Sequence, residues 1–150
     1  MNLILEHTGQ VPYFTEMASV FRALKISASD YDWYISDIET NYDVPGLSAE
    51  NQWLTGAALH RLVTEQEIQF IWAVFSAVPR GVRPAFTNPP CANGNCSYWT
   101  DAECKPQLEG ALFEIACWDS SATILVGITA EMAANFYQVY SDAKLLSVSH

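Results

Sequence analysis

Apolar residues recur along this chain at two spacings, one typical of helices and one typical of strands. Residues 13–24 carry an apolar stripe at helical spacing, which predicts an amphipathic helix. Residues 31–39 (YDWYISDIE) are rich in aromatic and β-branched side chains and therefore predict a strand. Residues 2–6 (NLILE) form a shorter candidate for a first strand.

The middle of the chain contains a second helix and a buried strand. Residues 55–65 begin with Thr55 in a position suited to an N-cap and place their leucines on one face, which predicts a short helix. Residues 67–78 fit both the helical and the strand spacing of apolar residues. Their β-branched and aromatic side chains, and Pro79 as a stop, favour a strand buried on both faces.

The C-terminal third predicts a hairpin followed by a helix. Residues 111–118 and 122–128 are apolar runs joined by a tight turn at 119–121, and Thr129 is a suitable cap for a helix over 130–140. Strands mixed with helices predict an α+β fold, with α/β as the alternative. We expect a single sheet of about five strands with about three helices packed on it.

Length and charge narrow the class of protein. The 150 residues fit one domain, spanning 1–150, with its own hydrophobic core. Acids number 17 and bases 7, which gives a net charge of −10. A nucleic-acid-binding surface has the opposite sign, so we expect no nucleic-acid partner. A basic protein partner suits this charge, although acidity also keeps an apolar domain in solution.

The N-terminal residues show no targeting signal. They lack the basic start of a signal peptide, and Glu6 interrupts their apolar run. No apolar stretch approaches the ~18 residues of a transmembrane helix. We therefore expect a cytoplasmic protein with no membrane partner, in which cysteines are reduced.

The interval between Lys25 and Arg61 contains six acids, several aromatic residues and no base. Tyrosine and tryptophan anchor protein interfaces, and acids steer a basic partner, so this interval is the candidate partner-binding surface. The candidate residues are Asp30, Asp32, Tyr34, Asp37, Glu39, Tyr42 and Asp43. The alternative is that the aromatic side chains point into the core and the acids are only solvated.

Three cysteines lie in the long irregular segment at about residues 79–110, which we expect to be an insertion. Asn93-Gly94 is a strong signal for a type I′ hairpin turn, which would place Cys91 opposite Cys96. Free thiols, a disulfide and a zinc site using Cys91, Cys96 and Cys104 all remain open. Cys117, in contrast, shares a strand face with apolar residues and is expected in the core.

Catalytic motifs are missing from the sequence. GxSxG, GxxxxGK[ST], GxGxxG and HExxH do not occur. His60 is a candidate base only by residue type. Glu114 and Asp119 flank the hairpin turn, where turn chemistry and solvation explain them without catalysis. A small enzyme of unknown reaction, using His60 or Asp119, is therefore an alternative, and we expect no cofactor.

The order of these elements resembles that of small bacterial α/β proteins of the immunity type, which accompany secreted toxins. The resemblance covers about half of the chain: residues 31–39, 54–63, 68–78, 113–128 and 136–146. It implies a cytoplasmic protein that works by binding, and it carries over no functional residue. We therefore expect a non-enzymatic binding protein, such as an inhibitor of a basic toxin or nuclease. A small zinc-binding module is a further alternative.

Overall fold

A computed structural model describes residues 1–147, which form an α+β fold built on one open antiparallel sheet. The strands are β1 (Leu3–Glu6), β2 (Asp32–Thr40), β3 (Gln52–Leu54), β4 (Phe70–Val78), β5 (Phe113–Trp118), β6 (Ala122–Val126) and β7 (Lys144–Leu145). The helices are α1 (Met17–Leu24), α2 (Gly56–Glu65), α3 (Ser97–Thr100) and α4 (Ala130–Val139). The strand order is β3-β2-β4-β5-β6-β1-β7. The α+β prediction is confirmed.

The number of elements was underestimated. Within residues 1–147 the sheet has seven strands rather than about five, and there are four helices rather than about three. The additional strands, β3 and β7, lie at the two edges of the sheet and span three and two residues. Such short strands show no alternation, so periodicity does not reveal them.

The predicted helix caps are present. The hydroxyl of Thr55 accepts a hydrogen bond from the amide of Ala58, and that of Thr129 accepts one from Met132. The first helix is shorter than residues 13–24. It begins at Met17 because Thr15 has a φ of 64°, a left-handed conformation that no helix continues through.

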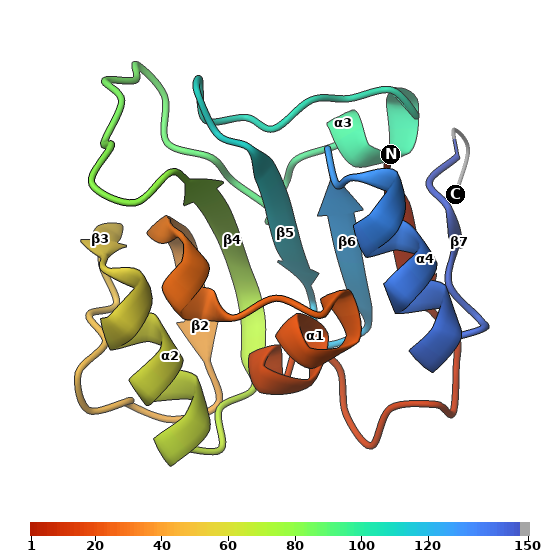
Figure 1. Ribbon diagram of the computed structural model, residues 1–150, viewed down its shortest axis with the longest axis horizontal. Helices are drawn as coiled ribbons and strands as arrows, with labels where there is room; N and C mark the ends of the chain where they lie inside the picture. The colour runs from red at the N-terminus through yellow and green to blue at the C-terminus, as the bar shows by residue number, and fades with distance from the viewer. Residues whose placement is uncertain (148–150) are drawn as a thin grey trace.

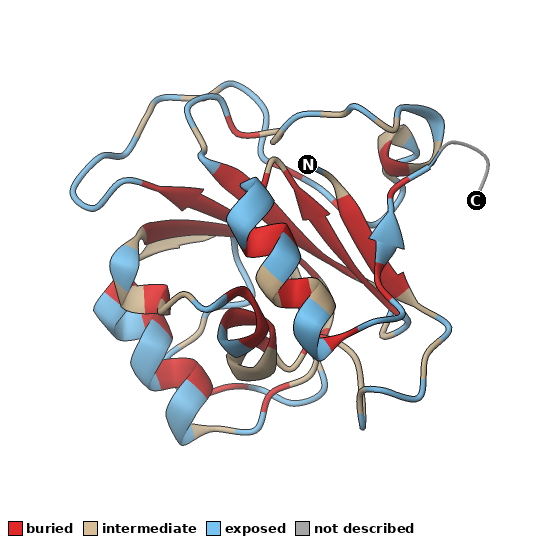
Figure 2. Ribbon diagram, turned by 45° about the vertical axis from the view of Figure 1, so that its right-hand side comes forward, coloured by how far each residue is buried: buried red, intermediate tan, exposed pale blue. Residues whose placement is uncertain are grey.

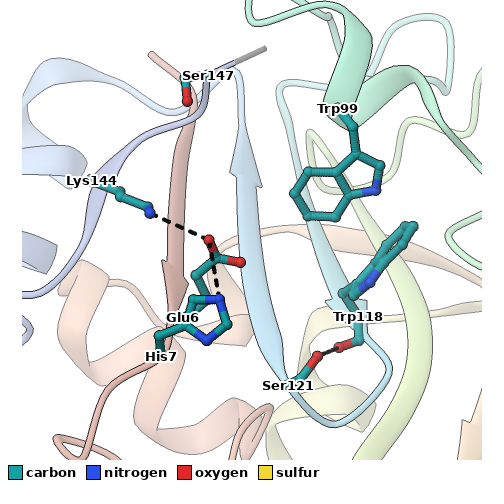
Figure 3. Close-up of a pocket in the computed structure, with 7 residues that line it drawn as sticks. All are labelled: Glu6, His7, Trp99, Trp118, Ser121, Lys144 and Ser147. Atoms are coloured by element: carbon teal, nitrogen blue, oxygen red, sulfur yellow. Dashed lines mark hydrogen bonds and ion pairs between the residues drawn. The ribbon is translucent and has the colours of Figure 1, made fainter. Parts of the chain in front are cut away.

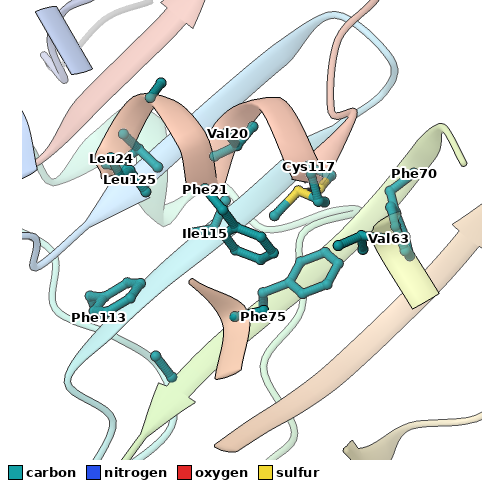
Figure 4. Close-up of a cluster of buried hydrophobic side chains, with 14 of the residues drawn as sticks. Val20, Phe21, Leu24, Val63, Phe70, Phe75, Phe113, Ile115, Cys117 and Leu125 are labelled. Atoms are coloured by element: carbon teal, nitrogen blue, oxygen red, sulfur yellow. Dashed lines mark hydrogen bonds between the residues drawn. The ribbon is translucent and has the colours of Figure 1, made fainter. Parts of the chain in front are cut away.

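Helices α1, α2 and α4 all lie on one side of the sheet, which we call the helix face (Figure 1). The main core fills the space between these helices and the sheet, and it includes Phe21 of α1, Trp33 of β2, Phe75 of β4 and Phe113 of β5. Figure 4 shows Phe21, Phe75 and Phe113 of this cluster. Cys117 is fully buried in this cluster, which confirms its predicted core position.

The opposite side of the sheet is covered by residues 79–112, which include α3 and which we call the covering segment. Tyr98 and Leu108 of this segment are buried against residues whose side chains point away from the helices. The predicted insertion is therefore part of a second core layer. Most residues of β1, β2, β4, β5 and β6 are buried, whereas the edge strands β3 and β7 are not (Figure 2). We call this side of the sheet the segment face.

Candidate functional site

One row of side chains crosses five strands on the segment face. Glu39 is the cross-strand partner of Trp72, Trp118 is the partner of Ala122, and Ala122 is the partner of Glu6. Between these pairs, the rings of Trp72 and Trp118 pack against each other, with their centroids 5.0 Å apart. We call these five residues the tryptophan row. It places two half-buried indoles between two carboxylates.

A bulge in β2 brings Glu39 into this row. Ser36 pairs with Val74 and Glu39 pairs with Trp72, so two residues of β2 oppose Ala73 alone. The first of the two, Asp37, has a φ of 54°. The extra residue reverses the alternation of β2, and Glu39 therefore lies on the same side as Trp72.

A pocket of about 560 Å³ lies at the other end of the row, between two tryptophans and the Glu6 carboxylate (Figure 3). The rings of Trp99 and Trp118 form its aromatic wall, with centroids 4.9 Å apart and planes at 87°. Facing them, an oxygen of Glu6 lies 3.4 Å from Lys144 Nζ and 3.8 Å from His7 Nε2. The Lys144 ammonium therefore compensates the charge of this carboxylate.

Two of the predicted partner-binding acids have structural roles. The carboxylate of Asp32 accepts hydrogen bonds from the amides of Gly56 and Gly81, at 3.2 and 3.0 Å. That of Asp37 accepts from two consecutive amides of the covering segment, Ala92 and Asn93, at 2.9 and 2.8 Å. These carboxylates tie α2 and the covering segment to β2.

Two further candidates also have partners inside the protein. The carboxylate of Asp30 accepts from the amide of Ser27 and so caps the 3₁₀ turn Ala28–Asp30. Tyr34 is buried on the segment face, where its ring packs against Trp53 and Phe86. The alternative interpretation of the sequence, in which the aromatic side chains point into the core, therefore applies to Tyr34.

Glu39, Tyr42 and Asp43 are exposed. Glu39 and Asp43 line a second pocket of about 560 Å³, between the end of β2 and residues of the loop 43–49. The hydroxyl of Tyr42, which is 40% exposed, donates to Gln66 Oε1 at 3.0 Å. The same Gln66 donates to the carbonyl of Pro45, so this loop is fastened to the end of α2.

The exposed acids around this loop are not neutralised within the described chain. Among residues 1–147, every ion pair shorter than 4.0 Å involves Glu6. Glu65 and Glu67, which flank Gln66, are exposed as Glu39 and Asp43 are. We call Glu39, Tyr42, Asp43, Glu65 and Glu67 the acidic patch.

The cysteine segment does not form the predicted hairpin. The amide of Asn95 donates to the carbonyl of Ala92, so Asn93-Gly94 is a turn, but only Gly94 has positive φ, at 81°. This is the type II geometry, and no strand flanks it, so the type I′ hairpin prediction was wrong. Cys91 and Cys96 are exposed free thiols.

The three cysteines do not assemble a metal site. Over residues 1–147, no three His, Cys, Asp or Glu side chains lie close enough together to hold a metal ion. Cys104 is half-buried beside the second core layer, and its carbonyl accepts a hydrogen bond from Nδ2 of the Asn2 side chain. Burial and the nearby Glu114 raise the pKa of this thiol to about 11. The structure thus offers no support for the zinc alternative.

Glu114 is fully buried on the segment face, so its expected solvation beside the hairpin turn was wrong. Its two oxygens accept hydrogen bonds from the Tyr98 hydroxyl at 2.5 Å and the Gln107 amide at 2.8 Å. The Gln107 side chain in turn bonds both backbone groups of Cys91. These contacts fasten the covering segment to the sheet, which explains a carboxyl group in the interior without invoking catalysis.

Burial raises the pKa of Glu114, although its hydrogen bonds oppose the shift. A raised folded-state pKa means that the folded protein holds this proton more tightly than the unfolded chain. The resulting stabilisation is present below the unfolded value of 4.5 and is lost as pH rises through the folded pKa.

Glu114→Gln is therefore expected to gain stability relative to the unmodified protein as pH rises above 4.5. Urea unfolding of both proteins at several values between pH 4.5 and 8 measures the difference. Glu131→Gln, at an exposed position of α4, is the control for removing one carboxylate from the surface. A difference between the Glu114 variant and the unmodified protein that stays constant with pH would contradict the prediction.

The residues considered for catalysis lie on separate elements. His60 is exposed on α2, with Nδ1 3.5 Å from Ser27 Oγ, and it lines a small pocket with residues of α1. Asp119 is exposed in the turn between β5 and β6 and does not contribute to that pocket. The structure therefore does not bring His60 and Asp119 together in one pocket.

The chain matches no family model, and comparison with curated proteins and with solved structures finds no match either. Over residues 1–147, no helix has the length and apolar character needed to cross a membrane.

Proposed function

We propose that this protein is a non-enzymatic binding protein that holds a basic protein partner against the acidic patch. The observation that carries the proposal is the set of exposed carboxylates, Glu39, Asp43, Glu65 and Glu67, none of which is in an ion pair within residues 1–147. Together with a net charge of −10, such groups attract a basic surface and accelerate its docking.

The patch also contains a suitable anchor. Tyr42 exposes its ring, yet its hydroxyl is held by Gln66 and its loop is held by the Gln66–Pro45 bond. A side chain that is already fixed loses little conformational entropy on binding. Tyrosine is among the residues that contribute most to interface energies.

The partner that fits best is the basic domain of a toxin, and the protein would then act as a cytoplasmic immunity protein. A nuclease binds the nucleic-acid backbone through clustered lysine and arginine residues. An acidic protein docked on that surface covers the substrate site directly. The resemblance of the element order to immunity-type proteins supports the same class of partner.

Co-expression with each neighbouring gene product, followed by purification, identifies the partner. We then expect the double variant Glu39→Gln/Asp43→Asn to associate about tenfold more slowly at low salt. Stopped-flow measurements at increasing ionic strength should show the two rates converging, because salt screens exposed charges.

The control is Glu131→Gln, which removes an exposed charge on α4. It should change the association rate little. The proposal fails if the co-purifying protein is not basic, or if the double variant and this control associate at the same rate.

A further inference from the structure

We infer that the tryptophan row receives an arginine side chain of the basic partner, stacked on Trp72 and paired with Glu39. This inference rests on the proposed function and goes beyond it, because it assigns one partner residue type to one place. The site lies on the segment face of the sheet. Of the residues that the sequence predicted to bind a partner, only Glu39 belongs to the tryptophan row.

The register places the two groups within reach of a single cation. Glu39 and Trp72 are direct cross-strand partners on the same side of the sheet. Side chains in such positions have Cβ atoms about 4.5–5.5 Å apart. A cation lying over the Trp72 indole is therefore also within reach of the Glu39 carboxylate.

The aromatic side of the site is held in place before any partner arrives. Trp72 packs against Trp118 with the ring planes at 68°, and Trp118 packs against Trp99 at 87°. Tyr98, whose hydroxyl is bonded to the buried Glu114, packs against Trp118 as well. Binding therefore requires little reordering of these rings.

Arginine matches this pair of groups better than lysine does. Its planar guanidinium stacks on an aromatic face and can still donate two parallel hydrogen bonds to a carboxylate. A lysine ammonium is a strongly hydrated point charge that satisfies the carboxylate but stacks poorly. Negatively charged groups are repelled by Glu39 and by the other carboxylates of the acidic patch.

The two ends of the row differ, and the difference selects the Glu39 end. Glu6 is already paired with Lys144. Glu39 is exposed and has no ion pair within residues 1–147. An incoming cation therefore gains a new partner at Glu39, whereas at Glu6 it would compete with Lys144.

The protein makes the same kind of contact within its own chain. The guanidinium of Arg83 lies 5.4 Å from the ring centroid of Trp53 on the covered part of the sheet. Trp53 is therefore already in contact with a cation, whereas Trp72 lies beside Glu39, which has no ion pair within residues 1–147. This makes Trp53 the matched control position.

Hexa-arginine and hexa-lysine peptides of equal charge provide the test, with binding followed by NMR of the indole N–H signals. We expect hexa-arginine to bind about fivefold more tightly than hexa-lysine and to shift the Trp72 and Trp118 signals. Trp72→Leu should abolish the preference for hexa-arginine, and Glu39→Gln should weaken the binding of both peptides. Trp53→Leu should leave the preference in place.

The outcomes separate this inference from the function on which it rests. If both peptides bind equally, or if Trp72→Leu keeps the preference, the arginine site is wrong while acidic docking stands. If neither peptide binds, the proposed function fails together with the inference. Should Trp72→Leu not fold, the signals of the unmodified protein and the exposed Glu39→Gln variant decide the result.

Discussion

Gly56→Ala is expected to destabilise the protein by about 4 kcal/mol, a large part of the stability of a small domain. A Cβ at this position would lie 2.1 Å from the carbonyl oxygen of Tyr31 and 2.5 Å from that of Ala28. Both are backbone atoms, which cannot rotate away as a side chain does. Relief therefore requires α2 to move off the 3₁₀ turn, which also breaks the bond from the Gly56 amide to Asp32.

Chemical unfolding followed by circular dichroism measures this effect. Gly9→Ala is the control, because a Cβ there has no neighbour within 4 Å. It should change the free energy of unfolding by less than about 0.5 kcal/mol. If the two variants were equally stable, the close approach of α2 to the 3₁₀ turn would not exist as described.

Trp33→Ala is expected to cost about 3–5 kcal/mol, the usual range for removing a large buried aromatic side chain. The indole is fully buried, and its Nε1 donates to the carbonyl of Ala28 at 2.9 Å. Its ring also contacts Phe21, Phe75 and Phe113, which belong to one helix and two strands. Truncation therefore leaves a cavity between the sheet and α1, and an acceptor without its donor.

Trp33→Phe is the intermediate variant, because it keeps a six-membered aromatic ring in the core but removes the pyrrole part of the indole and its hydrogen bond. It should cost less than half as much as alanine. Thermal unfolding followed by circular dichroism is suitable, since the fluorescence signal itself changes when a tryptophan is removed. A loss below about 1 kcal/mol for Trp33→Ala would show that the site collapses around the missing ring.

Elements with strong local signals were predictable from the sequence. Thr55 and Thr129 cap their helices through groups only three residues away, and the β5–β6 hairpin closes through a short turn. The covering segment has no such signal, because its contacts are long-range. Asp32 reaches Gly81 and Asp37 reaches Ala92, so these acids look solvated in the sequence although they are bonded in the structure.

The candidate site was predictable only in part, because it also depends on long-range contacts. Composition indicated an acidic, aromatic surface, and the structure leaves Glu39, Tyr42 and Asp43 exposed. The tryptophan row depends on strand order and on the bulge at Asp37, which shifts every later residue of β2 to the other side. No spacing within the sequence relates Glu39 to Trp72 or Trp72 to Trp118.

The position of β1 has a consequence for how the protein assembles. This strand lies between β6 and β7, so that Leu3 pairs with Leu125 on one side and Leu145 on the other. During synthesis β1 is made before both of its neighbours, and it can be placed only after β6 and β7 have been made. The chain between β1 and its partner strands forms a long loop, and the entropy of that loop is lost before the β1 contacts form. We therefore expect slow folding for a domain of this size. Until then the apolar edge of β6 is open, and this is the interval in which the nascent protein is most exposed to aggregation.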